Sequence, residues 1–277
     1  MSVMDSFNLK GKVAIITGGA GLLGVKHGEA IIEAGGVPVL VDIDGDKARH
    51  WAGVLIQNNP GAQALGIETD IANAQAVEDL LAHVLKTFGR VDILINNAAN
   101  NPKIDQNGGF QALGRIEDFP LDAWNQDIAV GLTGAFLMSR TLGQYMASHG
   151  GGVILNIASD LGLIAPDQRL YAKQGLPDDQ QPVKPVTYSV VKTGLIGLTR
   201  YLATYWAGKG VRVNAIAPGG VQNNQDADFV ERLSNLIPLG RMAEPDEYKA
   251  SILFLVSDAS SYMTGSVVAA DGGRSCW

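Results

Sequence analysis

The chain has 277 residues, 46% of them hydrophobic, which is enough for one domain, residues 1–277, with a substantial core. Its formal net charge of -7 argues against a nucleic-acid-binding surface. The single cysteine, Cys276, excludes an intrachain disulfide and suits a reducing compartment, so we expect a cytoplasmic protein. We expect neither a signal peptide in the polar segment 1–12 nor a membrane span, since no apolar run is long enough.

Short apolar runs alternate with helical patterns along the chain. The predicted strands span residues 13–16, 37–41, 64–67, 91–95, 153–157, 211–216 and 266–269. A first predicted helix ends near Glu33, and further helices span residues 45–57, 73–88, 121–148, 186–207 and 245–256. This alternation predicts an α/β fold: a doubly wound parallel sheet of about seven strands with helices on both faces.

A glycine-rich turn joins the first predicted strand to the first predicted helix. Gly19, Gly21 and Gly24 fit G-x-G-x-x-G, in which glycines allow close backbone approach and helix N–H groups meet a pyrophosphate. Asp42 ends the second strand about 20 residues later, where a carboxylate would bind ribose hydroxyls and repel a 2′-phosphate. Asp42 could also be an ordinary loop-initiating acid. The turn and the acid predict a Rossmann-like domain that binds NAD rather than NADP.

A tyrosine and a lysine, Tyr188 and Lys192, lie four residues apart on one face of the predicted helix 186–207. Alone, such a pair usually means a half-buried aromatic beside a solvated charge. Near a dinucleotide, the cation would lower the tyrosine pKa, and the tyrosine could then exchange a proton with a carbonyl or alcohol. Ser159 follows the strand 153–157 and would orient the substrate oxygen, although alone it reads as a strand-end serine.

These motifs occur in the order typical of the short-chain dehydrogenase/reductase family, which the chain resembles over nearly its whole length. The matching positions are Asp70, Asn96-Asn97-Ala98-Ala99, Ser159 after Asn156-Ile157-Ala158, Tyr188, Lys192, Pro218-Gly219 and Asp271-Gly272-Gly273. The resemblance implies an oxidoreductase that interconverts a carbonyl and a secondary alcohol with NAD, with Ser159, Tyr188 and Lys192 as catalytic residues. It implies cofactor contacts from Gly18, Gly21, Leu22, Leu23, Gly24, Asp42, Ile43, Asp70, Ile71, Asn97, Ala98, Ala99, Tyr188, Lys192, Pro218, Gly219, Val221 and Asn223.

Three positions depart from the family pattern. Leu22 replaces the middle glycine of the usual turn, and the resulting spacing resembles the extended branch that acts on sugar nucleotides, whereas the chain length resembles the single-domain branch. Gly131 replaces an asparagine thought to hold the water of a proton relay. A water or another polar side chain takes over there, or the relay is weaker. Asn223 stands where a threonine often meets the nicotinamide carboxamide.

Two segments are candidates for substrate contacts. Tyr188 follows Ser159 by 29 positions, more than is usual in the family, and we interpret the proline-rich residues 162–185 as an insertion or lid near the active site. Residues 219–240 would form a substrate-binding loop and short helix. The substrate candidates Asn100, Asn101, Arg169 and Tyr171 would suit a sugar, a sugar nucleotide or another hydroxyl-rich or anionic substrate. They are equally explained as solvated loop residues, and a ketoacyl thioester or small alcohol stays open.

Two other functions stay open at this stage. One is a family member that binds NAD without catalysis and serves regulation or assembly, and the other is an epimerase or dehydratase that recycles NAD on a sugar nucleotide. The family resemblance implies a homotetramer or homodimer, with the helices 121–148 and 186–207 at the interface, although their apolar residues are equally explained as core. The four histidines are scattered, so we expect no metal. We expect only a small-molecule carbonyl or alcohol partner, without nucleic acid or membrane.

Overall fold

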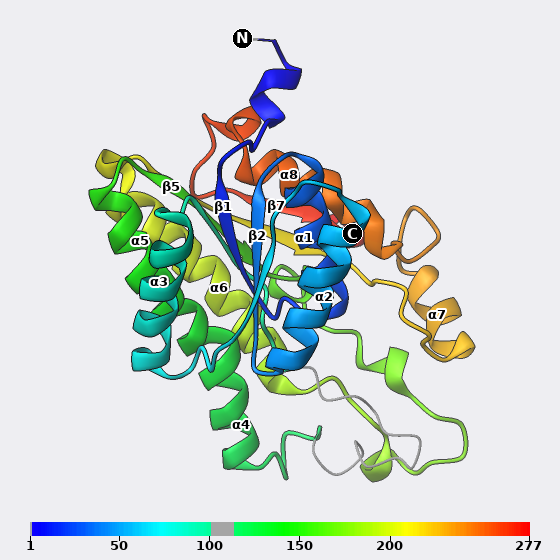
Figure 1. Cartoon of the computed structure of the whole chain (residues 1–277). Coiled ribbons are helices and arrows are strands. Elements are labelled where there is room, and N and C mark those ends of the chain that lie inside the picture. The colour runs from blue at the N-terminus through cyan, green and yellow to red at the C-terminus, as the bar shows by residue number, and fades with distance from the viewer. Residues whose placement is uncertain (1, 101–113) are drawn as a thin grey trace.

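The computed structural model describes residues 2–100 and 114–277, and it is built on one seven-stranded parallel sheet (Figure 1). The strand order is β3-β2-β1-β4-β5-β6-β7. The strands are β1 Val13–Thr17, β2 Val37–Asp42, β3 Leu65–Glu68, β4 Ile93–Asn96, β5 Gly152–Ile157, β6 Val211–Pro218 and β7 Val267–Ala270. The predicted fold class is confirmed, and the strand order reverses between β1 and β4, where ligands of such sheets bind.

Helices cover both faces of the sheet (Figure 1). One face packs against α1 (Leu22–Glu33), α2 (Gly45–Asn58) and α8 (Lys249–Val256). The other packs against α3 (Ala74–Phe88), α5 (Gly134–Ser148) and α6 (Val186–Tyr205), while α4 (Leu121–Ile128) leads into α5 and α7 (Ala227–Ser234) follows β6. No helix in the described part of the chain is long and apolar enough to cross a membrane.

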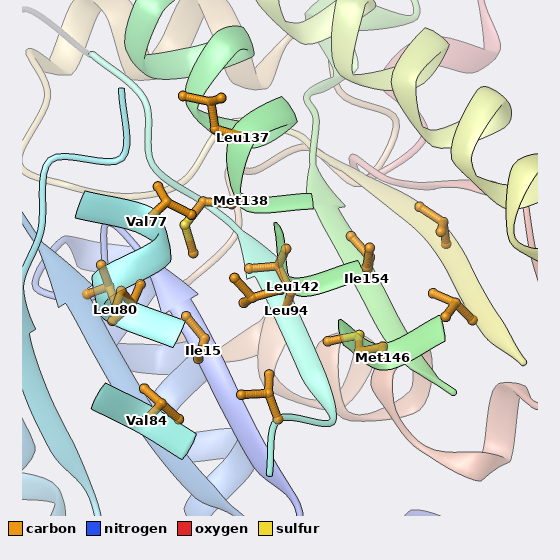
Figure 2. Packing of buried hydrophobic residues seen from close by; sticks show 14 of the residues in the cluster. Ile15, Val77, Leu80, Val84, Leu94, Leu137, Met138, Leu142, Met146 and Ile154 are labelled. Carbon is orange, nitrogen blue, oxygen red and sulfur yellow. The ribbon is translucent and has the colours of Figure 1, made fainter. Parts of the chain in front are cut away.

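The layer between the sheet and α3 and α5 shows why the sequence folds this way (Figure 2). Val77, Leu80 and Val84 recur at helical spacing on α3 and are at most 2% exposed. They pack with Ile15 of β1 and Leu94 of β4 in one cluster. Burial of each such side chain contributes about 1.5–3 kcal/mol, so the strands that carry the site are held rigidly.

The predicted helix 121–148 is interrupted. One π-helical turn, Ala129–Thr133, separates α4 from α5, and Gly131 lies within it. π-helical turns inside helices are frequent at functional sites. The predicted helix 245–256 also starts differently, because Pro245–Tyr248 is a 3-10 turn that begins with a capping box between Glu244 and Glu247.

The segment 162–185 packs against the segment 219–240. It contains two 3-10 turns, Gln168–Tyr171 and Asp178–Gln180. Leu170 is buried in a cluster with Leu233 of α7, Ile237 and Met242. The Arg232 Nε also donates to the Leu170 carbonyl across 3.1 Å, so the two segments support each other beside the carboxyl ends of β5 and β6.

Candidate active site

The glycine turn after β1 is shaped for a close backbone approach. Gly18 has φ 59°, and a Cβ on it would lie 2.9 Å from the Ala98 Cα, so a side chain is excluded there. Gly21 precedes α1 and supplies no side-chain cap for the helix N-terminus. The first N–H groups of α1 therefore stay available for an anion, and the turn fits the pyrophosphate of a dinucleotide.

Asn97 holds this turn from the neighbouring strand. Its Nδ2 donates to the carbonyls of Thr17 and Gly18, across 3.0 Å and 3.1 Å. The Thr17 hydroxyl in turn accepts from the N–H groups of Asn97 and Ala98, across 3.0 Å and 3.1 Å. The predicted cofactor residues after β1 and β4 thus form one connected structure.

A cleft of about 670 Å³ lies over the carboxyl ends of the strands. The predicted cofactor residues that line it are Gly18, Gly21, Leu23, Asp42, Ile43, Asp70, Ile71, Asn97, Ala98, Ala99, Tyr188, Lys192, Pro218, Gly219 and Val221. Three predicted residues, Leu22, Gly24 and Asn223, do not line it. Their backbones flank the lining positions, but the side chains of Leu22 and Asn223 are exposed.

Asp42 lies at the end of β2, and two backbone N–H groups donate hydrogen bonds to its carboxylate. Its Oδ2 accepts from the N–H of Ala20 across 3.1 Å, and its Oδ1 accepts from the N–H of Asp44 across 3.2 Å. A carboxylate has about four acceptor positions, so two remain for ribose hydroxyls. Among the described residues that line the cleft, the one basic side chain is Lys192, which lies beside Tyr188 rather than beside Asp42.

The structure brings Ser159, Tyr188 and Lys192 together. Ser159 follows β5 and is 4% exposed, and Tyr188 and Lys192 lie one turn apart on α6. The Lys192 Nζ donates to the Ile157 carbonyl across 2.7 Å and lies 5.8 Å from the centre of the Tyr188 ring. The Ser159 hydroxyl is close enough to the Tyr188 phenol to affect its pKa. A hydroxyl substrate next to Tyr188 would therefore also meet Ser159.

The electrostatics of this group differ from the sequence-based expectation. Burial raises the pKa of Tyr188, and the Ser159 hydroxyl only partly opposes it. Burial also lowers the pKa of Lys192 to about 8, and the neighbouring charge of Lys184 acts in the same direction. In the protein alone, desolvation thus outweighs the effect of the lysine on the tyrosine.

Gly131 is explained by its neighbour. A Cβ at this position would lie 2.6 Å from the Val191 Cγ1, so Val191 occupies the space that an asparagine side chain would need. Beside them is a cavity of about 20 Å³ lined by residues that include Asp127, Gly131 and Lys192. That volume holds about one water molecule. Asp127 accepts a hydrogen bond from the Thr187 hydroxyl across 2.5 Å.

The substrate candidates are not all placed alike. Asn100 lines both the cleft and the small cavity, and Tyr171 is half-buried, with burial raising its pKa to about 12. The Arg169 side chain is 88% exposed and paired with Asp167 across 2.7 Å, and it does not line either cavity. Asn101 lies outside the described residues.

Lys184 lies in the same segment 162–185 as Arg169 and Tyr171, but it is not among the four substrate candidates. Its Nζ lies 3.8 Å from the centre of the Tyr188 ring, and burial lowers its pKa to about 8. Other missed residues that line the cleft are Val41, Thr69, Ala72, Gln126, Ala129, Val130, Ile157 and Ala158. Several of these residues directly follow the end of a strand, and that position in the sequence is the signal by which they could be found.

Comparison with known proteins shows the family of the chain. A family model described as enoyl-(acyl carrier protein) reductase matches residues 23–275, and the chain belongs to the short-chain dehydrogenase/reductase family. D-threitol dehydrogenase of Mycolicibacterium smegmatis is 34% identical over 278 residues, covering 99% of this chain and 96% of that protein. The NAD-dependent glycerol dehydrogenase of Listeria innocua is 34% identical over 272 residues, covering 96% and 95%.

Solved structures share the whole fold. A gluconate 5-dehydrogenase from Burkholderia cenocepacia, in complex with NADP and tartrate, superposes with TM-score 0.84 at 26% identity, with both chains fully covered. A short-chain type dehydrogenase/reductase from Mycobacterium marinum gives TM-score 0.85 at 30% identity, also over both full chains. The chain is therefore an oxidoreductase of CH–OH groups with a nicotinamide-cofactor fold, in a family whose members include NAD and NADP enzymes.

Proposed function

We propose that the protein is an NAD-dependent dehydrogenase of a polyol or a sugar-derived secondary alcohol. One observation carries the proposal: Ser159, Tyr188 and Lys192 lie together beside a cleft that Asp42 also lines. The relatives named for threitol and glycerol support a small hydroxyl-rich substrate.

In this mechanism, Ser159 holds the reacting oxygen beside Tyr188, and Tyr188 removes the hydroxyl proton as a general base. The bound NAD supplies the hydride acceptor. Lys192, fixed by the Ile157 carbonyl, places positive charge near Tyr188 and favours its phenolate form. The alcohol loses a hydride and a proton and becomes a carbonyl compound.

Asp42 supports NAD as the cofactor. A carboxylate held at the ribose position repels a 2′-phosphate, and the described lining residues offer no basic side chain beside it. The segments 162–185 and 219–240 would cover the substrate, because they follow the carboxyl ends of β5 and β6 and pack against each other. Asn223 is also proposed as a cofactor contact, because it lies two residues after Val221, which lines the cleft.

The test is NADH formation at high pH from threitol, glycerol, xylitol, gluconate and simple secondary alcohols, with Tyr188→Phe as the matched control. We expect turnover of at least one polyol and a loss of about 10²–10⁴-fold in the variant, the usual contribution of a general base. The variant should still bind NADH, as followed by fluorescence. A variant with wild-type turnover would refute the role of Tyr188, and no turnover of any polyol would refute the substrate class.

We also propose a homotetramer or homodimer in the cytoplasm. Phe136 of α5 and the stacked Tyr201 and Tyr205 of α6 are exposed aromatic side chains on the two helices predicted to pack across an interface. The single cysteine supports a reducing compartment. Light scattering of the purified protein distinguishes these assemblies from a monomer, which would contradict the proposal.

A further inference from the structure

Lys184 lies against Tyr188 and borders the small cavity beside Gly131. Its Nζ lies 3.8 Å from the centre of the Tyr188 ring, which is closer than the 5.8 Å of the Lys192 Nζ. Both lysines and Tyr188 line the cavity of about 20 Å³, which has room for about one water molecule. The cavity therefore joins the proposed general base to a second amine that the proposed mechanism does not use.

The chain fixes the backbone of Lys184 from both sides. The Lys184 N–H donates to the Gln168 Oε1 across 2.8 Å, which ties it to the 3-10 turn Gln168–Tyr171. Pro185 follows directly and is the N-cap residue of α6, the helix that carries Tyr188. A proline restricts the residue before it to extended conformations. The place of Lys184 relative to Tyr188 is therefore well defined.

A proton must leave this site in every oxidation. The alcohol loses its hydroxyl proton to Tyr188, so Tyr188 must pass that proton on before the next turnover. Lys192 is 5% exposed and its Nζ donates to the Ile157 carbonyl across 2.7 Å, so it is nearly closed off from solvent. Lys184 is half-buried, and it therefore reaches both the cavity and the solvent.

The charge state of Lys184 suits a proton carrier. Burial lowers its pKa to about 8, and the negative charge of Asp160 opposes this only in part. A lysine with such a pKa is partly a neutral amine near pH 8, and a neutral amine can accept a proton. The other charged groups beside it are Lys192 of α6 and Asp127 of α4, which line the same cavity.

We propose that Lys184 carries the substrate proton from Tyr188 to solvent, through a water molecule in the cavity that both residues line. The proposal rests on the role proposed above for Tyr188 as general base. The alcohol hydroxyl protonates the Tyr188 phenolate. The Tyr188 hydroxyl then gives a proton to the water as the water gives one to the Lys184 amine, and the Lys184 ammonium releases it to solvent. One proton leaves for each alcohol oxidised, and the water is unchanged.

Three variants separate proton transfer from charge and from unspecific effects. Lys184→Met keeps an extended side chain but removes both the charge and the proton carrier. Lys184→Arg keeps the charge but cannot exchange a proton near neutral pH, because arginine stays protonated. Lys173→Met is the matched control, since Lys173 is an exposed lysine of the same segment 162–185.

The experiment measures kcat at pH 8 with an alcohol that the wild-type enzyme oxidises, at constant ionic strength and over a series of imidazole concentrations. We expect kcat to fall about 100-fold in both Lys184 variants, the low end of what a proton-transfer group contributes, and less than about twofold in Lys173→Met. Imidazole is a neutral base at this pH, so it should restore kcat about tenfold in the two variants and leave the wild type unchanged. Thermal unfolding and NADH fluorescence check folding and cofactor binding, and Lys184→Gln replaces Lys184→Met if the latter does not fold.

The two Lys184 variants also decide between proton transfer and a purely electrostatic role. Wild-type kcat in Lys184→Arg, with a loss in Lys184→Met, would show that only the charge matters and would overturn the proposal. A kcat within about threefold of wild type in both variants, or a loss that imidazole does not restore, would overturn it as well.

The wild-type assay decides the proposed function separately, because it contains no change at Lys184. If the wild-type protein oxidised no alcohol, its crystal structure would decide on the proton route. A water in the cavity within hydrogen-bond distance of the Lys184 Nζ would support the route, and a cavity without such a water would overturn it.

Discussion

Replacing Gly131 with asparagine, the residue usual in the family, should destabilise this protein. An added Cβ would lie 2.6 Å from the Val191 Cγ1, whereas favourable carbon contacts lie at about 3.5–4.0 Å. One of the two helices must therefore shift by about 1 Å, or Val191 must change its rotamer. Val191 directly precedes Lys192, so the shift would also reach the proposed active site.

The size of the effect follows from two opposing contributions. Overpacking of a core costs about 1–3 kcal/mol. Replacing a glycine within a helix returns about 0.3 kcal/mol in backbone entropy, so the net loss in unfolding free energy is about 0.7–2.7 kcal/mol. For a chain of this size, that corresponds to a fall in Tm of about 1–11 °C.

The assay is thermal and urea unfolding of Gly131→Asn, Val191→Ala and the double variant. The double variant should lose less stability than the sum of the single changes, because alanine at position 191 makes room for the asparagine. Additive losses, or a Gly131→Asn variant as stable as wild type, would show that the Gly131 and Val191 contact does not explain the departure from the family pattern.

Three further predictions concern single side chains. Asp42→Ala should raise the ratio of NADP to NAD in kcat/KM by about tenfold or more, about 1.4 kcal/mol, and an unchanged ratio would contradict the ribose role. Arg169→Ala should leave KM for an anionic substrate within about twofold, since its exposed pair with Asp167 contributes little, and a large rise in KM would return Arg169 to the site. Lys184→Met should stabilise the cofactor-free protein at pH 7 and below, because its folded pKa of about 8 lies below the ordinary 10.5 and protonation in the folded state is disfavoured. This gain should shrink by up to about 2 kcal/mol by pH 9.5, as measured by urea unfolding, and a gain independent of pH would refute the reasoning.

The sheet was predictable because its signals are local. Apolar runs such as residues 13–16 and 37–41 are buried strands, and helix starts carry capping side chains such as Asp44 and Asn73. The π-helical turn at Gly131 was not predicted, because residues 121–148 read as one helix, and the packing of Gly131 against Val191 joins two distant segments. Strand ends differed by one or two residues, as they depend on pairing with neighbours.

The site was predictable where spacing alone sets geometry, as for Tyr188 and Lys192 on one helix face. Contacts between distant segments were not. The pair of Asp160 and Arg274 joins residues 114 positions apart, and no pattern in the sequence links the two segments. The basic residues of the segment 162–185 looked alike in sequence, yet Lys184 lies over the Tyr188 ring whereas Arg169 pairs with Asp167 at the surface.

The strand order also bears on how the chain folds during synthesis. The strands β1 to β4 form one continuous block of the sheet, and β5, β6 and β7 follow it along one edge in chain order. Each later strand therefore pairs with one that has already emerged, so the sheet can grow from a single edge as the ribosome delivers it. Gly18 and Asp42, which we propose as contacts of the adenosine end of the cofactor, are therefore synthesised and paired in the sheet before the proposed catalytic residues Ser159 and Tyr188.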